Sequence, residues 1–174
     1  MILKNLGIDF IAVPADIDEH NDGLKKWYAI AKSISRRKAE KVAEEYPDDW
    51  VLGSDTFVVM KNGHLALKPK DRDDARKTVN MYRNSYCDVY SGLALINKSL
   101  KKKFVGYEKT RIFFRDFSDK EREEFLDSGE WEGRSGSMTV EGKGGKWIER
   151  MEGEYWNVVG LPVNLLKEFL KKVN

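Results

Sequence analysis

The stretch VLGSDTFVVM, residues 51–60, constrains the fold more than any other part of the chain. Its apolar residues are β-branched, aromatic or long aliphatic types, which fit the pleated and buried surface of a strand. The centre of the stretch is nevertheless polar, because Ser54, Asp55 and Thr56 follow Gly53. A buried carboxylate without partners is costly in free energy. Asp55 must therefore have either bonding partners or a chemical task.

Composition places the chain among globular proteins of one domain, with or without two lobes. It has 174 residues, 41% of them hydrophobic and 34% charged, so it can bury a sizeable core and is not disordered. No apolar run approaches the roughly 20 residues that span a bilayer, and the N-terminus has no signal-peptide pattern. We therefore expect a cytoplasmic protein. The net charge of +2 predicts no binding to nucleic acid or to membranes.

Cysteine and histidine are too rare to build the common zinc sites. Cys87 is the only cysteine, and the histidines are His20 and His64. An intrachain disulfide is impossible, which fits a reducing compartment, and a structural zinc site of Cys and His is excluded in practice. A divalent ion held by carboxylates and phosphates remains open.

Strands and helices alternate along the chain, which predicts an α/β fold. Pro14 closes the first predicted strand, and Pro47 follows the first long helix. Asp71 and Ser118 are predicted N-caps. The predicted strands span residues 8–14, 50–60, 86–97 and 104–117, with another inside 144–156, and the predicted helices span residues 25–46, 71–82, 118–129 and a segment that Pro162 opens.

Two acidic residues have both a structural and a functional interpretation. Asp55 either caps a turn at a bend in the strand, or it binds a metal ion or acts as the base that activates water. Glu19 lies in the acidic loop ADIDEHNDG. It is either a solvated surface acid or a ligand for magnesium.

Two lysines have the same ambiguity. Lys38 lies on the inward stripe of its predicted helix, because steps of about 3.6 residues from Trp27 pass near it. It is either a lysine whose ammonium group reaches back to solvent or a cation directed into a cleft. Lys68 precedes Pro69, which favours an extended backbone, and alone it is an ordinary turn lysine. Together the lysines and the acids indicate metal-assisted phosphate chemistry, since Lys and Mg²⁺ neutralise phosphate charge.

Taken in order, several segments of the chain resemble the Maf family of nucleotide pyrophosphatases. Each segment is weakly specific alone, but their order and spacing together are specific, and GSDT, KP and NVVGLP carry the most weight. The segments, from about residue 3 to 170, are DIDE, RKAEKVA, VLGSDTFV, LKPKDRDDA, YSGLAL and GRSGSMTVEGKGGKWIERMEGEYWNVVGLP.

The resemblance implies an elongated α/β fold with a mixed sheet, flanking helices and a central cleft between two lobes, similar to inosine triphosphate pyrophosphatases. It implies hydrolysis of nucleoside triphosphates between the α and β phosphates, which yields a monophosphate and pyrophosphate and removes non-standard or modified nucleotides. The implied cofactor is a divalent cation, Mg²⁺ or Mn²⁺. Relatives often form homodimers.

The same resemblance assigns roles to the candidate residues. Asp55 is the catalytic base and a metal ligand, and Glu19 lies near the metal. Lys38 and Lys68 contact phosphates of the substrate. The polar centre of residues 51–60 would then face the place where metal, water and triphosphate meet.

Two further positions of the family pattern bear on the choice of base. Thr56 resembles the branch that acts on dTTP and UTP, whereas Glu141 resembles the branch that acts on 7-methyl-GTP. A carboxylate accepts hydrogen bonds from a guanine edge, while an amide both donates and accepts. The predicted substrate is therefore of 7-methyl-GTP or dTTP/UTP type, with the first slightly favoured.

The family pattern also contains an SxSPRR-like phosphate loop, and this chain starts where that loop should already have ended. Either the native protein lacks the loop, or Met1 is an internal methionine of a longer chain. The absence of its hydroxyl and arginine donors predicts weakened or absent turnover, since arginine contacts with phosphate are charge-assisted and strong. The alternative function is therefore a catalytically impaired nucleotide-binding regulatory protein involved in septum formation or cell division.

Overall fold

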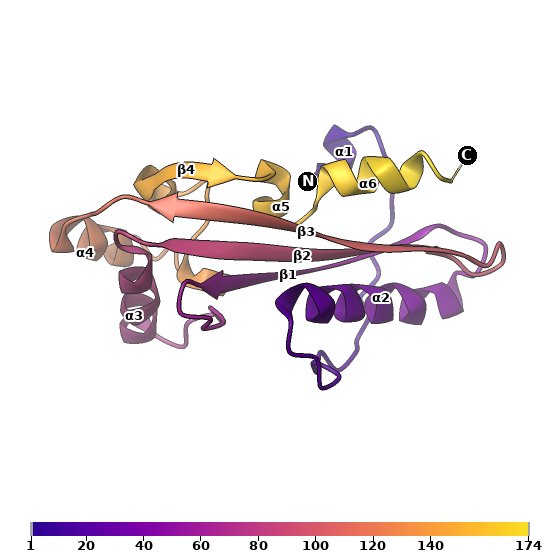
Figure 1. Ribbon diagram of the computed structural model, residues 1–174, viewed down its shortest axis with the longest axis horizontal. Coiled ribbons are helices and arrows are strands. Elements are labelled where there is room, and N and C mark those ends of the chain that lie inside the picture. Colours follow the sequence, from indigo (N-terminus) through magenta and orange to yellow (C-terminus); the bar gives the residue numbers. More distant parts are fainter. Residues whose placement is uncertain (1, 174) are drawn as a thin grey trace. The chain divides into compact units, whose positions relative to one another are not determined.

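The computed structural model describes residues 2–173, and it confirms the predicted α/β fold class with helices beside a sheet (Figure 1). The strands form one four-stranded sheet in the order β1-β2-β3-β4. The strands are β1 (Val51–Met60), β2 (Tyr86–Asn97), β3 (Lys102–Phe114) and β4 (Ile148–Glu152). The helices are α1 (Ile2–Asn5), α2 (Trp27–Glu45), α3 (Arg72–Tyr82), α4 (Asp119–Asp127), α5 (Tyr155–Val159) and α6 (Val163–Leu170), with the short 3₁₀ helices η1 (Ser135–Ser137) and η2 (Lys143–Trp147).

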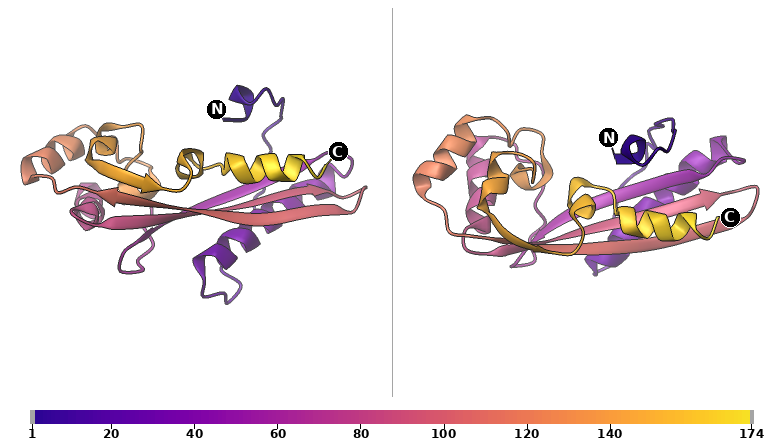
Figure 2. Two further views of the ribbon diagram at one scale, coloured as in Figure 1. Left: turned by 45° about the horizontal axis from the view of Figure 1, so that its top comes forward. Right: turned by 90° about the horizontal axis from the view of Figure 1, so that it is seen from above.

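The sheet is antiparallel, whereas the resemblance implied a mixed sheet. β4 pairs with β3 in the antiparallel sense, with Arg111 opposite Glu152 and Phe113 opposite Arg150. The arrows of neighbouring strands point in opposite directions in Figures 1 and 2. A mixed sheet needs a parallel neighbour, and the segment that we predicted as the first strand does not join the sheet.

That prediction of a strand at residues 8–14 was wrong, because the structure has neither helix nor strand there. Phe10 and Ile11 expose 41% and 71% of their surface, so the apolar side chains that predicted a strand are not covered by a sheet face. A strand forms only where a neighbour completes its backbone hydrogen bonds, and Pro14 has no N–H to offer. The apolar residues predicted a strand at 8–14, but a strand forms only where its backbone pairs with a neighbouring strand.

The described chain forms two compact units. The first contains Met1–Thr56, Ser91–Glu108 and Gly160–Asn174, and the second contains Phe57–Tyr90 and Lys109–Val159. Strands β1, β2 and β3 each pass from one unit to the other. The cleft that the resemblance implies between two lobes stays a prediction.

Two glycines allow α2 to lie directly on the sheet in the first unit. A Cβ atom on Gly92 would lie 2.0 Å from the carbonyl oxygen of Ala31, and one on Gly53 would lie 2.4 Å from that of Ser35. These distances exclude any side chain, so the helix backbone packs against β1 and β2. Figures 1 and 2 show α6 on the opposite face of this part of the sheet, where it shares a core cluster with β2.

An aromatic core fills the second unit. Trp147 stacks on Phe117 with ring centroids 4.1 Å apart, and Phe125 meets the same indole edge-on. Cys87 is buried in this cluster, and burial raises the pKa of its thiol to about 12. The thiol is therefore protonated at neutral pH and unreactive while the core is closed.

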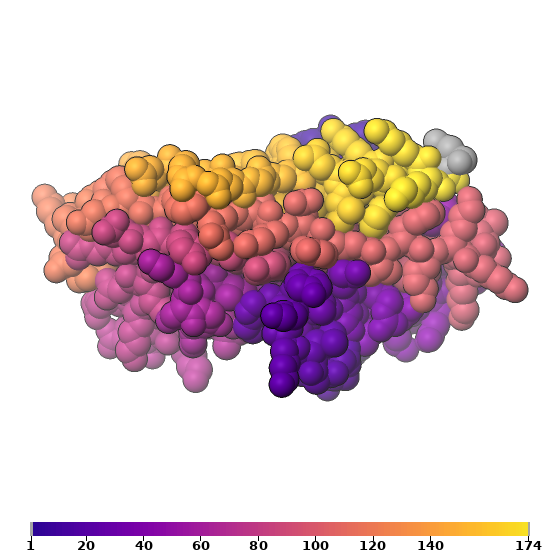
Figure 3. Space-filling view, in the orientation of Figure 1, coloured from indigo at the N-terminus to yellow at the C-terminus, as the bar shows by residue number. Residues whose placement is uncertain are grey.

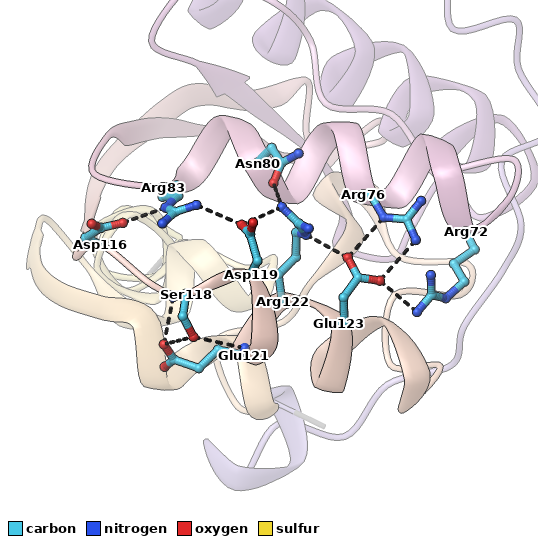
Figure 4. Close-up of polar contacts among 10 residues, drawn as sticks. All are labelled: Arg72, Arg76, Asn80, Arg83, Asp116, Ser118, Asp119, Glu121, Arg122 and Glu123. Carbon is cyan, nitrogen blue, oxygen red and sulfur yellow. Dashed lines mark hydrogen bonds and ion pairs between the residues drawn. The ribbon is translucent and has the colours of Figure 1, made fainter.

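Charged side chains join α3 to α4 in the second unit (Figure 4). Glu123 of α4 accepts charge-assisted contacts at 3.0 Å from both Arg72 and Arg76 of α3. Arg122 of α4 in turn donates to Asn80 of α3 at 2.9 Å. We call this set the α3–α4 network; it comprises Arg72, Arg76, Asn80, Arg83, Asp116, Ser118, Asp119, Glu121, Arg122 and Glu123.

The helices begin close to where the sequence predicted. Asp71 accepts a hydrogen bond from the backbone N–H of Asp74 at the start of α3. Ser118 accepts one from the N–H of Glu121 at the start of α4, so both predicted N-caps are confirmed. Within residues 2–173, we find no helix with the length and apolar character needed to cross a bilayer.

Candidate active site

Asp55 lies on β1, and its side chain is directed toward α2. The side chain is 10% exposed, and its Oδ1 accepts a hydrogen bond from Lys38 Nζ at 2.7 Å. Its Oδ2 is buried and has no hydrogen-bond partner among residues 2–173. Burial raises the pKa of this carboxyl group, although the hydrogen bond from Lys38 opposes the shift. Oδ2 is therefore free to accept a proton or to bind a cation.

The two hydroxyls beside Asp55 have ordinary partners. Ser54 Oγ donates to the carbonyl oxygen of Gly92 at 3.1 Å. Thr56 Oγ1 forms a hydroxyl–hydroxyl hydrogen bond of 2.8 Å with Ser91 Oγ. Because side chains alternate along a strand, both hydroxyls lie on the face of β1 opposite Asp55. The polar centre of the strand thus combines bonded hydroxyls with a carboxylate that has one free oxygen.

Lys38 connects the two candidate acids of the first unit. It extends from α2 with 23% of its side chain exposed, and its Nζ lies 2.7 Å from Asp55 Oδ1 and 2.6 Å from Glu19 Oε1. Burial lowers the pKa of Lys38, but the hydrogen bonds to both carboxylates outweigh it, and the net shift is upward. The ammonium group is therefore charged at neutral pH. The structure brings these predicted residues together.

A cavity of about 490 Å³ lies next to this cluster in the first unit. Glu19, Lys38 and Ser54 are among its polar lining residues, and Val42 and Leu52 are among its apolar ones. Its volume lies in the range of small-molecule sites, roughly 300–1,000 Å³. The cavity therefore offers room for a phosphate-containing ligand beside the Lys38 cation.

Lys68 and Glu141 belong to the second unit. Lys68 is exposed and precedes Pro69. Glu141 is also exposed, and the hydroxyl of Tyr155 donates to its Oε1 at 3.3 Å. Asp55 and its neighbours belong to the first unit, so the predicted substrate contacts of Lys68 and Glu141 stay predictions.

The carboxylates of Asp55 and Glu19 are the possible ligands for the divalent cation that the resemblance implies. Within residues 2–173 no group of three or more His, Cys, Asp or Glu side chains is arranged to hold a metal ion. Asp55 and Glu19 nevertheless meet at one ammonium group, and Asp55 Oδ2 has no hydrogen-bond partner in the described part of the chain. Mg²⁺ commonly takes one or two carboxylates and completes its shell with water and substrate phosphates. These residues therefore fit a cation that binds together with a nucleotide.

Sequence reasoning missed three residues that the structure connects to candidate positions. Arg37 binds the loop of Glu19, Ser91 pairs with Thr56, and Tyr155 pairs with Glu141. The arginine pair in SRRKA is a local signal for the first of these. The other two residues carry no local signal in the sequence.

Comparison with known proteins identifies the family. The sequence model described as Maf-like protein matches residues 1–173. The chain is 33% identical over 173 residues to a dTTP/UTP pyrophosphatase of Dictyoglomus thermophilum, a match that covers 99% of this chain and 89% of the relative. It is 36% identical over 171 residues to dTTP/UTP pyrophosphatases of Pelotomaculum thermopropionicum and Elusimicrobium minutum, with 98% of this chain covered in both and 89% and 91% of the relatives. The chain therefore belongs to the Maf-like protein family.

Proposed function

We propose that this protein is a nucleoside triphosphate pyrophosphatase that cleaves its substrate between the α and β phosphates. The observation that carries the proposal is the buried carboxylate of Asp55, which Lys38 holds through one oxygen while the other oxygen is free. Asp88 provides the contrast, because Arg111 and Lys109 contact both of its oxygens. Relatives named dTTP/UTP pyrophosphatase match nearly the whole chain and support the same activity.

In the proposed reaction Asp55 accepts a proton from the attacking water through Oδ2. Its raised pKa makes it a better proton acceptor than an exposed aspartate. The water oxygen bonds to phosphorus as the bond to the bridging oxygen breaks, and pyrophosphate leaves. Lys38 fixes the carboxylate through Oδ1 and supplies positive charge close to the phosphates.

The remaining roles follow the resemblance. We propose that Lys68 contacts the phosphates and that Thr56 contributes to base selection. When bound, a divalent cation, Mg²⁺ or Mn²⁺, would neutralise phosphate charge. Asp55 and Glu19 are its proposed protein ligands, and Glu19 is 53% exposed, which leaves it accessible to an incoming ion.

The proposed substrates are dTTP and UTP, because the relatives carry that name. 7-Methyl-GTP, which Glu141 favours by sequence, is the competing substrate. Uracil and thymine present an N–H between two carbonyl oxygens, whereas guanine presents neighbouring N–H groups that one carboxylate can accept together. Glu141 itself cannot donate to a base carbonyl. Glu141→Gln should therefore raise the ratio of UTP to 7-methyl-GTP hydrolysis if this residue reads the base.

Pyrophosphate release from dTTP, UTP, CTP, GTP and 7-methyl-GTP in the presence of Mg²⁺ tests the proposed function. We expect release from dTTP and UTP that stops when the metal is chelated and that falls by roughly 10²–10⁴-fold in Asp55→Asn. Asp88→Asn is the matched control, because Asp88 is a partly buried carboxylate with both oxygens bonded. The proposal fails if the unmodified chain releases no pyrophosphate, or if Asp55→Asn and Asp88→Asn are equally active.

We also propose a homodimer in the cytoplasm, as the resemblance implies. Light scattering on the purified protein distinguishes one 20.1 kDa chain from two. A monomer at all accessible concentrations would contradict this expectation without affecting the proposed chemistry.

A further inference from the structure

Arg37 holds the backbone on both sides of Glu19. Its Nη1 donates to the carbonyl oxygen of Asp18 at 2.6 Å, and its Nη2 donates to that of His20 at 2.5 Å. One planar guanidinium group, which presents its donors in a fixed fork, thus binds the two peptide groups that flank the candidate ligand. Only 19% of the Arg37 side chain is exposed, although the loop residues that it contacts lie at the surface.

Asp22 ties the same loop to α2 at a second point. Ser33 of α2 donates to Asp22 Oδ2 at 2.5 Å, and Arg37 Nε lies 3.4 Å from the same oxygen. His20 Nε2 lies 2.6 Å from the other carboxylate oxygen. The hydrogen bond from Ser33 is the main cause that holds the pKa of Asp22 below its usual value. The loop is therefore bonded to α2 through both its backbone and a side chain.

Side-chain contacts matter for this loop because it lies outside the helices and strands. The dark segment before α2 lies at the surface in Figure 3. The Glu19 side chain is mostly exposed, and an exposed ion pair alone holds a side chain weakly. An irregular surface segment without anchors samples many backbone conformations, each of which would move the Glu19 carboxylate.

Neighbouring residues of α2 thus have complementary contacts. Arg37 donates hydrogen bonds to the loop backbone, while Lys38 forms ion pairs with Glu19 and Asp55. Adjacent residues on a helix point about 100° apart, so one helical turn can contact the loop and the strand at the same time. The loop that carries Glu19 is thereby held at the same helical turn that supplies Lys38.

We propose that Arg37 is a positioning residue, which fixes the loop of residues 16–22 so that the Glu19 carboxylate faces Lys38 and the metal-binding side of the active site. The inference rests on the proposed function in one respect, namely that Glu19 serves as a metal ligand there. A loop held in place before the ligand arrives lowers the ordering entropy that binding must otherwise overcome.

We call the two hydrogen bonds from Arg37 to the carbonyl oxygens of Asp18 and His20 the clamp. Arg37→Met removes both donors of the clamp and leaves an uncharged, apolar side chain. Arg36→Met is the matched control, because it removes the same charge one residue earlier on α2, where Arg36 pairs with Glu40 at 2.7 Å. Arg37→Lys keeps the positive charge but loses the planar fork, so it should restore the clamp only in part.

The first measurement is hydrogen–deuterium exchange on the protein without metal or nucleotide. Arg37→Met should accelerate exchange in residues 16–22 and leave the rest of α2 unchanged, whereas Arg36→Met should behave like the unmodified chain. The second is Mn²⁺ binding by titration calorimetry in the presence of a non-hydrolysable triphosphate. Loss of an outer partner of a metal ligand typically costs roughly 10–100-fold in metal affinity, and we expect that loss for Arg37→Met but not for Arg36→Met.

Equal exchange in residues 16–22 for Arg37→Met and Arg36→Met would overturn the clamp. Faster exchange together with unchanged Mn²⁺ affinity would overturn its role in positioning Glu19. If the unmodified chain releases no pyrophosphate from any triphosphate, the proposed function fails, while the exchange and Mn²⁺ titration still decide on Arg37. Partial recovery in Arg37→Lys supports positioning by directed hydrogen bonds rather than by charge.

Discussion

Carboxylates in two regions of the molecule have opposite properties. At the candidate active site, Asp55 is largely buried, has a raised pKa, and has one oxygen without a hydrogen-bond partner among the described residues. Arginine contacts lower the pKa of Glu121 and of Glu123 in α4 to about 2, and Figure 4 draws the contacts of Glu123. Arg115 is the main cause for the first of these glutamates, and Arg76 for the second.

The charged glutamates of α4 stabilise the fold, whereas the carboxylate of Asp55 has an oxygen available for chemistry. A fully bonded glutamate favours its ionised form and stabilises the folded state. A buried and partly bonded aspartate disfavours its ionised form and makes folding harder, which is the condition of many catalytic acids and bases. Among these carboxylates, the raised pKa belongs to the group with an oxygen available for chemistry, and the lowered pKa values belong to ion-paired groups.

Lys38→Met should have the largest effect of the changes that test this comparison. It leaves Asp55 buried without its cation and removes positive charge from the cavity. We expect pyrophosphate release to fall by about 100-fold or more, and the unfolding temperature to fall as well. An activity assay and calorimetry on the same preparation measure both.

The double variant Lys38→Met/Asp55→Asn is the control for that change. It removes the unpaired charge, so most of the lost stability should return while the activity stays low. If the stability does not return, Lys38 stabilises the first unit through the packing of its methylene groups instead.

Gly92→Ala should disturb the active site through the backbone. The new Cβ atom would lie 2.0 Å from the carbonyl oxygen of Ala31, so α2 must move and carry Lys38 away from Asp55. We expect a lower unfolding temperature and a loss of activity of up to about 100-fold, as a misplacement near 1 Å can cause. Gly106→Ala is the control, since its Cβ would meet only the side chains of α6 at 3.1 Å. Equal losses in both variants would contradict this explanation.

Glu123→Gln should show the opposite pattern to the active-site variants. It removes the charge that Arg72 and Arg76 contact, so the unfolding temperature should fall by a few degrees while pyrophosphate release is unchanged. Glu124→Gln, whose residue lies 3.9 Å from Lys120, is the control and should change neither quantity. A loss of activity in Glu123→Gln at a temperature where it is fully folded would break the proposed separation of roles.

Acid should weaken the α3–α4 network in a defined pH window. The pKa of Glu123 is about 2 in the folded protein, against a usual value of 4.5. Its stabilisation is therefore present above about pH 4.5 and is lost as the pH falls toward 2. Denaturant titrations between pH 5 and 2 should show a smaller decline for Glu123→Gln than for the unmodified chain, and added salt should reduce the difference. Parallel declines would mean that other carboxylates dominate acid unfolding.

Sequence predicted the local elements well and the distant contacts poorly. Helical spacing predicted Lys38 on the inward side of α2, and residue types predicted Asp55 on a strand. For each residue the sequence left both a structural and a functional interpretation open. The structure joins them over 17 positions of sequence and joins Arg37 to Asp18 over 19. The failed strand at residues 8–14 has the same origin, because a strand depends on a partner that its own residues do not specify.

Cys87 gives the molecule a built-in reporter of local opening. Because the folded thiol is buried with a pKa of about 12, a disulfide reagent can react with it only in the fraction of molecules whose second unit has opened. As the single sulfhydryl in the chain, it makes the labelling rate a signal from one place without any engineered probe. Local opening of the unit that holds the α3–α4 network can thus be followed in solution while the protein is titrated with nucleotide.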